Sequence, residues 1–191
     1  MLKRIALGLF VVITLAVVII LAAAATRPAT YHVERSISTA AAPQVVFDVL
    51  NDFHRFHEWS PWQHLDPHMK VTFDGPPSGV GSSYAWVGNG EAGAGKMTIT
   101  ETSPPTALTL KLEFLQPFAS TCAVHYAIAS DGTGSHITWG MDGSNNYMSK
   151  VMSLFVSMDK MIGKDFETGL TALKQVAEAS ATTPTAQSAR P

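Results

Sequence analysis

Hydrophobic residues form three successive patterns along the chain, and each pattern predicts a different kind of element. Ile5–Ala25 is a continuous apolar run of 21 residues without a charge. Between Tyr31 and Gly143, short segments alternate apolar and polar residues, which is typical of β-strands with one buried face. From Tyr147 to about Ala179, apolar residues recur every three or four positions and predict a long amphipathic helix.

The first apolar run is long enough to cross a membrane, because a spanning helix needs about 20 apolar residues whereas the core of a secretory signal peptide has roughly 7–15. We therefore favour an uncleaved signal anchor with a short linker over residues 1–27. The alternative is a signal peptide cleaved near the small residues Ala22–Ala25. Lys3 and Arg4 precede the run, which predicts a single span of the inner membrane with a cytoplasmic N-terminus and an extracytoplasmic, periplasmic domain.

The middle of the chain predicts an antiparallel sheet. We expect strands at Tyr31–Ser38, His68–Gly75, Ser82–Gly88, Lys96–Thr102, Ala107–Leu115, Ser120–Ala129 and Ser135–Gly143. Short turns rich in Gly and Pro separate the last six of these strands, so they form a meander. Between the first two strands, Pro43 suits the first turn of a short helix, and a second short helix is expected to end near Trp59.

The predicted C-terminal helix must bury its stripe of Met and Phe side chains, and the concave face of a curved sheet is the available partner. Gly163 and Gly169 lie inside the helix, which indicates a bend or a close backbone contact, because Gly costs a helix about 1 kcal/mol relative to Ala. We expect one α+β domain over residues 30–179, in which the sheet wraps around the helix. The small polar residues 180–191 predict a disordered tail.

Four segments resemble a known superfamily: PQVVFDVLND after the first strand, FHRFHEWSPW, GVGSSYAWVG, and MDKMIGKDFETGLTALKQ in the last helix. Together with the order of elements, they resemble the helix-grip or START-like (SRPBCC) superfamily, and in particular bacterial polyketide cyclase/dehydrase-like proteins. The resemblance implies the helix-grip fold with a cavity between sheet and helix. That cavity would bind a lipid or an aromatic or polyketide-like metabolite. The superfamily has no universal catalytic motif, so the resemblance implies no catalytic residue.

In this fold the inward strand positions and the last helix would line the cavity. The predicted lining is Tyr84, Trp86, Met97, Ile99, Leu110, Leu112, Phe114, Val124, Tyr126, Trp139 and Met141 on the strands, Phe155, Met158 and Ile162 on the helix, and Phe56, Trp59 and Trp62 at the mouth. Burial contributes about 25 cal/mol per Å² of apolar surface, so such a lining holds an apolar ligand without charge pairing. The alternative is that the same side chains fill the core.

Composition and charge exclude several other functions. The formal net charge is −2 and the Lys and Arg residues form no basic patch, so we expect no nucleic-acid partner. The single cysteine, Cys122, cannot form an internal disulfide, and its apolar strand predicts a small buried side chain. The glycines of GNGEAGAG lie between two strands rather than before a helix, so they predict a hairpin turn and not a phosphate-binding loop.

The segment Phe53–Pro67 holds three of the seven histidines and is the main source of candidate acid–base groups. His57 is adjacent to Glu58, but on a helix His54 would share a face with Glu58, which is more typical of a solvated pair. A metal site needs three convergent ligands, and no HExxH-type spacing is present, so we expect neither a metal nor another cofactor. If the protein is an enzyme, His57 and Tyr84 are its candidate acid–base residues.

Three functions remain open at this point. We favour a membrane-tethered domain that binds a small hydrophobic molecule, over a cyclase or dehydratase acting on a hydrophobic substrate, and over an interaction domain with a filled cavity. A void of at least about 300 Å³ would distinguish the first two from the third. Titratable groups with perturbed pKa values inside the void would favour an enzyme over a binding protein.

Overall fold

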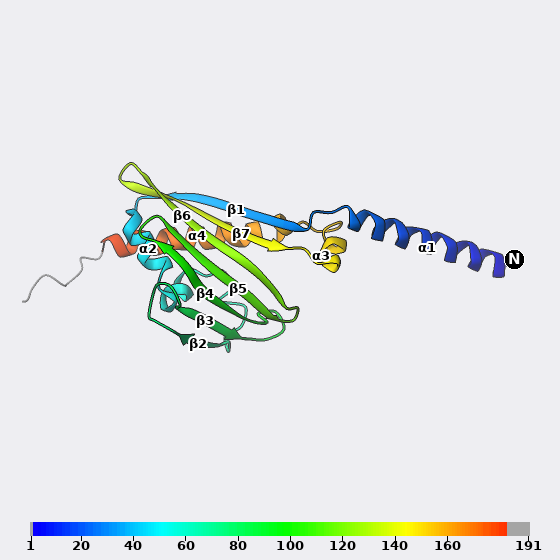
Figure 1. Cartoon of the computed structure of the whole chain (residues 1–191), viewed down its shortest axis with the longest axis horizontal. Coiled ribbons are helices and arrows are strands. Elements are labelled where there is room, and N and C mark those ends of the chain that lie inside the picture. Colours follow the sequence, from blue (N-terminus) through cyan, green and yellow to red (C-terminus); the bar gives the residue numbers. More distant parts are fainter. Residues whose placement is uncertain (1, 183–191) are drawn as a thin grey trace, which may run out of the picture.

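The computed structural model describes residues 2–182, and its elements follow the predicted order (Figure 1). They are α1 (Leu2–Ala25), β1 (Thr30–Thr39), α2 (Pro43–Leu50), the 3₁₀ helix η1 (Phe53–Glu58), β2 (Lys70–Asp74), β3 (Ser83–Val87), β4 (Ala94–Ser103), β5 (Ala107–Gln116), β6 (Ser120–Asp131), β7 (Gly134–Ser144), α3 (Tyr147–Met152) and α4 (Met158–Thr182). All seven predicted strands are present. The predicted tail is helical up to Thr182, and from residue 183 it lies outside the described residues.

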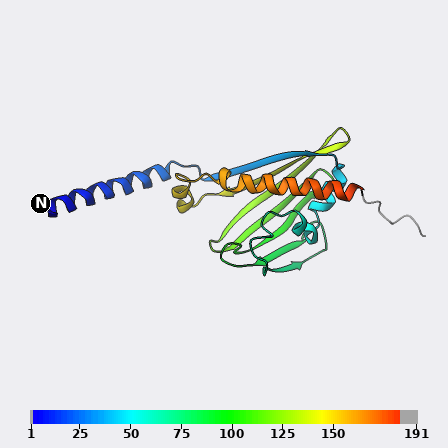
Figure 2. The same cartoon turned by 180° about the vertical axis from the view of Figure 1, so that it is seen from behind.

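The strands form one antiparallel sheet in the order β1-β7-β6-β5-β4-β3-β2. The six strands β2 to β7 are a meander, and β1 returns to pair with β7 along its whole length. The sheet is curved, and α4 lies along its concave side, packed against β1 and α2 (Figure 2). This is the helix-grip arrangement, so the predicted α+β fold class is confirmed.

Alternation along the strands separates the two faces of the sheet. Val33, Leu108 and Ile137 point inward and are almost completely buried, as are Phe166 and Leu173 on the facing side of α4. The intervening residues face solvent; His125 and His136 are exposed, as their strand positions predict. Cys122 is buried, also as predicted.

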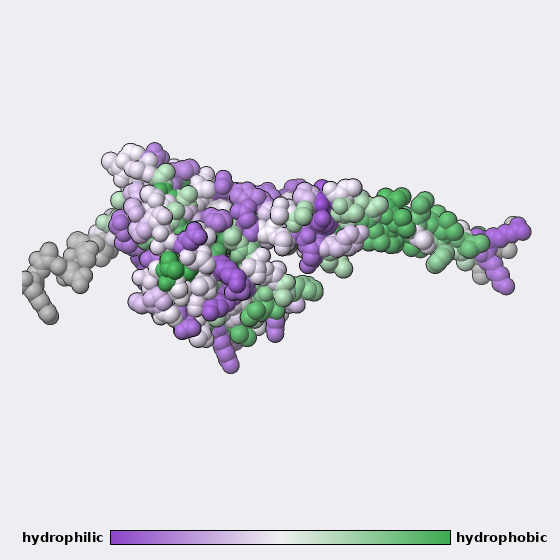
Figure 3. Space-filling view, in the orientation of Figure 1, coloured by the Kyte–Doolittle hydropathy of each residue, from purple (hydrophilic) through white to green (hydrophobic). Residues whose placement is uncertain are grey.

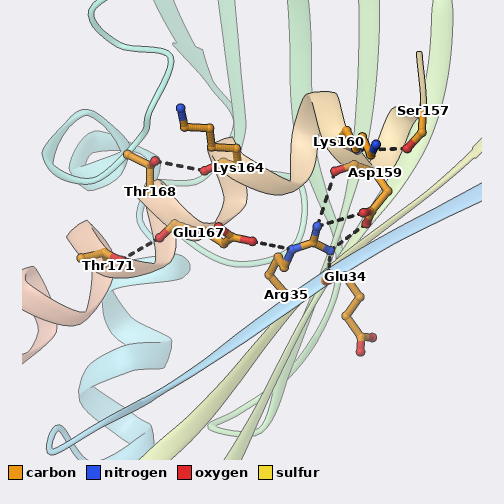
Figure 4. A network of polar contacts seen from close by, with 9 residues as sticks. All are labelled: Glu34, Arg35, Ser157, Asp159, Lys160, Lys164, Glu167, Thr168 and Thr171. Carbon is orange, nitrogen blue, oxygen red and sulfur yellow. Dashed lines mark hydrogen bonds and ion pairs between the residues drawn. The ribbon is translucent and has the colours of Figure 1, made fainter. Parts of the chain in front are cut away.

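Close contact, not a bend, explains the two glycines of α4, since the helix continues through both. A Cβ atom at Gly163 would overlap the guanidinium of Arg35, and one at Gly169 would lie 2.7 Å from the Trp139 ring. Arg35 comes from the inner face of β1 and donates to Asp159 (Nη1–Oδ1 2.7 Å) and Glu167 (Nε–Oε1 2.9 Å), as Figure 4 shows. These ion pairs fix α4 to the edge strand of the sheet.

The C-terminal helix differs from the prediction because it is divided in two. A turn at residues 153–157 separates α3 from α4, although the three-four spacing of apolar residues continues through it. The Asn146 side chain accepts from the backbone N–H of Ser149 (2.8 Å) at the start of α3, and Ser157 Oγ accepts from that of Lys160 (3.2 Å) at the start of α4. Each residue thus caps a separate helix.

Helix α1 projects away from the domain as an exposed apolar rod (Figures 1 and 3). Its 24 residues span about 36 Å at 1.5 Å per residue, which exceeds the roughly 30 Å of a bilayer core. It is long and apolar enough to cross a membrane. At its C-terminal end it contacts α3, where Tyr147 Oη donates to the carbonyl oxygen of Leu21 (2.7 Å) and Ala24 is fully buried.

Candidate functional site

A pocket of about 420 Å³ lies between the sheet and the first half of α4. Its volume exceeds the roughly 300 Å³ at which ligand pockets begin, so the interior is not filled at this position. Its walls are Tyr84, Trp86, Met97, Leu112, Phe114 and Met141 on the strands, Phe56, Ser60, Pro61, Trp62, Gln63, Leu65 and Met69 on the segment before β2, Glu91 and Ala92 in the β3–β4 turn, and Ile162, Asp165 and Phe166 on α4.

The register of the sheet explains which strand residues meet in the pocket. Tyr84 pairs with Met97, and Met97 pairs with Leu112, so these three side chains form one row across β3, β4 and β5. In the next inward row Gly95 lies between Trp86 and Phe114, whose rings contact edge to face across it (centroids 6.1 Å apart). Gly95 is required there because a Cβ atom would overlap the Trp86 ring.

The pocket occupies only the half of the sheet nearer to α1. Thr30 pairs with Ser144 at that end of the sheet. At the same end, Ala94 pairs with Val87 on one side and with Gln116 on the other. Among the predicted residues, those near this end line the pocket: Phe56, Trp62, Tyr84, Trp86, Met97, Leu112, Phe114, Met141 and Ile162. Alternation along a strand identifies a face but not a position along it, so the sequence could not locate this half.

The other residues predicted on the strands, and Trp59, do not line the pocket. Trp59, Leu110, Tyr126 and Trp139, like Ile99 and Val124, are buried in the packed core. Trp59 was expected at the mouth, but it points inward and packs edge-on against Trp139 (centroids 5.6 Å apart) and Tyr126 (6.2 Å). Trp139 also stacks on Phe166 at 4.1 Å. These rings belong to the packed core beside the pocket, and Phe166 is also part of the pocket wall.

The two predictions on the C-terminal helix also need correction. Phe155 lies in the turn between α3 and α4 and is 69% exposed, because the helix that was expected to carry it inward is interrupted there. Met158 is the first residue of α4; it packs against the core but lies outside the pocket wall. Ile162, one turn later, does reach the pocket.

Residues 60–69 and the β3–β4 turn form a wall of which the sequence predicted Trp62, but the sequence did not predict the contact that joins the two loops. Asp66 Oδ2 accepts from the backbone N–H of Asn89 (2.7 Å), and the Asn89 side chain donates to the carbonyl oxygen of Leu65 (3.1 Å). These bonds join two loops that are distant in sequence and place Gln63 and Glu91 at the pocket. Asp66 before Pro67 is a signal for a turn, but nothing in the sequence identifies its partner.

Polar groups in the wall are few: two indole N–H groups, the hydroxyls of Ser60 and Tyr84, the amide of Gln63 and two carboxylates. Trp62 Nε1 donates to Asp165 Oδ2 (3.3 Å), and Trp86 Nε1 donates to the carbonyl oxygen of Ala92 (3.0 Å). Gln63 Oε1 is buried without a hydrogen-bond partner among the described residues. Two carboxylates, Asp165 and Glu91, line the pocket, whereas its lining includes no Lys, Arg or His.

The two acid–base candidates differ in position. Tyr84 lines the pocket, and burial raises the pKa of its hydroxyl to about 12, so this group stays protonated at neutral pH. His57 is exposed on η1 and outside the pocket, with Nδ1 2.7 Å from the carbonyl oxygen of His54. The pocket therefore contains a neutral phenol but no imidazole.

The expected His54–Glu58 pair is wrong, because η1 is a 3₁₀ helix in which residues three apart are aligned. Glu58 instead pairs with Arg55 (Oε2–Nη2 2.8 Å), and His54 pairs with Asp52 (Nδ1–Oδ1 3.0 Å) and stacks on Phe73. Among residues 2–182, no three His, Cys, Asp or Glu side chains are grouped closely enough to hold a metal ion.

Comparisons with known proteins agree with this architecture. The chain is similar to protein CV1439 from Chromobacterium violaceum (TM-score 0.55, 13% identity, over 80% of this chain and 99% of that chain), and to protein MLL2253 from Mesorhizobium loti (0.56, 16%, 79% and 98%). It is also similar to protein Ms6760 from Mycobacterium smegmatis (0.54, 14%, 78% and 92%). At these identities the likeness concerns the fold alone.

No curated protein sequence matches the chain significantly. The family described as "Polyketide cyclase / dehydrase and lipid transport" matches residues 30–178, which is nearly all of the chain after α1. The helix-grip fold and the pocket under α4 fit that description. The chain therefore belongs to the polyketide cyclase/dehydrase and lipid transport family.

Proposed function

We propose that this protein binds a small hydrophobic molecule in the pocket beneath α4 while α1 anchors it in a membrane. The observation that carries the proposal is the pocket itself: a void of about 420 Å³ whose wall is mainly aromatic and aliphatic. A fully packed domain of this size would not leave such a space. Its family, which includes lipid-transport proteins, supports the same function.

The anchor is supported by the length and apolar surface of α1, whose side chains pack on the domain only near its C-terminal end. Lys3 and Arg4 at its start favour a cytoplasmic N-terminus and a domain outside the cytoplasm. A tethered domain in this position samples molecules that partition into the bilayer. Anchor and pocket are thus two parts of one function.

The polar groups of the wall narrow the class of ligand. Asp165 and Glu91 repel an anionic headgroup, and no cation in the lining compensates for them. The unpaired Gln63 Oε1 and the carboxylates accept hydrogen bonds, so they favour a ligand with a hydroxyl, amide or ammonium donor. We infer that the ligand is an uncharged or cationic amphiphile, such as a long-chain alcohol or a hydroxylated polyketide-like molecule.

The proposal is tested by native mass spectrometry of the full-length protein released from lipid nanodiscs. We expect a bound small molecule on the wild-type chain. Trp86→Ala should lower its occupancy, because it removes part of the wall. Val80→Ala, at an exposed position in the β2–β3 turn outside the pocket wall, is the control and should leave the occupancy unchanged. A wild-type chain without any adduct, or equal occupancy in both variants, would contradict binding at this site.

A further inference from the structure

The end of the domain that faces α1 carries two exposed apolar clusters. The first lies at the ends of β3 and β5 and in the β5–β6 turn, and consists of Val87, Leu115 and Phe118; Phe118 is 83% exposed. The second lies on α3 and the turn after it, and consists of Met148, Met152 and Phe155. Large exposed apolar side chains grouped in this way mark a surface that contacts a protein or a membrane.

The contact between α1 and α3 places the second cluster at a defined depth. Tyr147 Oη donates to the carbonyl oxygen of Leu21, so α3 lies level with the last turn of α1. A bilayer core of about 30 Å that begins near Ile5 ends about 20 residues later, at that same turn. The α3 segment therefore lies where the hydrocarbon core meets the headgroups, the region in which tyrosine is enriched in membrane proteins.

The charges around both clusters suit a lipid surface. Residues 143–158 contain a single charged side chain, Lys150, and residues 114–120 contain none. The α3 segment and the β5–β6 turn thus combine apolar side chains with one cation and no carboxylate, which is compatible with both the acyl–headgroup boundary and anionic headgroups. The β5–β6 turn and α3, which carry Phe118 and the second cluster, lie at the end of the domain that faces α1 (Figure 1), so a tilt of the kind common in spanning helices brings both to one bilayer surface.

We propose that the domain docks on the bilayer that α1 spans, with Phe118 and the α3 segment inserted into the lipid interface. This proposal rests on the membrane-spanning role of α1. Its consequence follows from the position of the pocket, which lies in the same half of the domain and includes the β3–β4 turn and the start of α4. Docking therefore holds the pocket next to the lipid, and a ligand can pass from the bilayer into the pocket with little exposure to water.

The test measures the depth of single labels in the full-length protein in nanodiscs of phosphatidylcholine and phosphatidylglycerol. Single cysteines replace Phe118, Met152, Thr133 or Val12 in a Cys122→Ala background and carry the fluorophore NBD. Thr133 lies in the exposed β6–β7 turn at the opposite end of the sheet and is the negative control. Val12 lies in α1 and reports whether that helix spans. Circular dichroism checks that each variant is folded.

We expect a blue shift at positions 12, 118 and 152 and loss of their emission when nitroxide-labelled lipid is included, with no change at position 133. If the labels at positions 118 and 152 emit as in water while the label at position 12 emits as in lipid, docking would be overturned but the anchor would stand. That result would point to a protein partner for the two clusters. Aqueous emission at 12 would overturn the anchor and docking together. Ligand occupancy is measured separately, by native mass spectrometry. A failure of docking is therefore distinguishable from a failure of the pocket to bind a ligand.

Discussion

Gly169 on α4 lies against a rigid neighbour, whereas Gly163 lies against a flexible one. A Cβ atom at residue 169 would meet the Trp139 ring, which is held by its stack on Phe166. We expect Gly169→Ala to lower the free energy of unfolding, because overpacking costs about 1–3 kcal/mol and exceeds the gain of about 1 kcal/mol in helix propensity. Gly163→Ala should cost less, since the Arg35 guanidinium can move aside. Urea unfolding compares the two; equal stability would contradict the prediction.

Arg35 makes the attachment of α4 to β1 dependent on pH. Its hydrogen bonds lower the pKa of the Asp159 carboxyl. The unfolded chain therefore binds this proton at a higher pH than the folded chain, so the stabilisation is complete above the ordinary aspartate pKa of about 3.9 and is lost as the pH falls through the lowered value. We expect Asp159→Asn to lower the urea midpoint at neutral pH and to differ less from wild type below about pH 4.

The control for this prediction is Glu101→Gln, which changes an exposed carboxylate on β4 outside the Arg35 network. The urea midpoint of Glu101→Gln should differ little from that of wild type, both at neutral pH and below about pH 4. The prediction would fail if Asp159→Asn and Glu101→Gln had the same midpoint at neutral pH, or if the gap between wild type and Asp159→Asn widened in acid.

At the scale of elements, the division between α3 and α4 depends on Ser157. Its hydroxyl oxygen accepts from the backbone N–H of Lys160 at the start of α4 (Figure 4). We expect Ser157→Ala to lower the free energy of unfolding by about 1 kcal/mol, whereas Ser157→Asp should keep the stability, because aspartate caps a helix equally well. Thermal unfolding followed by circular dichroism measures both variants. A loss of the same size in Ser157→Asp would show that the cap does not determine this helix start.

Elements whose burial repeats with a regular period were predictable from the sequence, and elements fixed by distant partners were not. Tyr84, Met97 and Leu112 were predicted to face inward because each alternates with a polar neighbour on its own strand, but their alignment in one row was not predicted. The capped break at Ser157 was missed because apolar spacing continues across it. The position of Gln63 in the wall was not predictable, because the bond from Asn89 to Asp66 joins two loops and no local pattern encodes that pairing.

At the scale of the whole molecule, the proposed anchor and docking surface favour a ligand that resides in lipid, and the carboxylates of the pocket are expected to discriminate among such ligands by charge. Dodecanol and dodecanoate share one chain length and both enter bilayers. Because Asp165 and Glu91 line the pocket without a cation, we expect the alcohol to bind about tenfold more tightly, which corresponds to about 1.4 kcal/mol. Native mass spectrometry of nanodiscs loaded with equal amounts of both molecules measures the ratio.

The double variant Asp165→Asn, Glu91→Gln removes both carboxylates and keeps the size of each side chain, so it tests whether charge causes the preference. We expect the ratio of bound alcohol to bound acid to fall towards one, with dodecanol occupancy itself little changed. Glu101→Gln, which removes a carboxylate outside the pocket, should leave the ratio at the wild-type value. If dodecanoate binds the wild-type chain as tightly as dodecanol, the wall does not discriminate by charge, and the ligand is selected by shape and apolar burial alone.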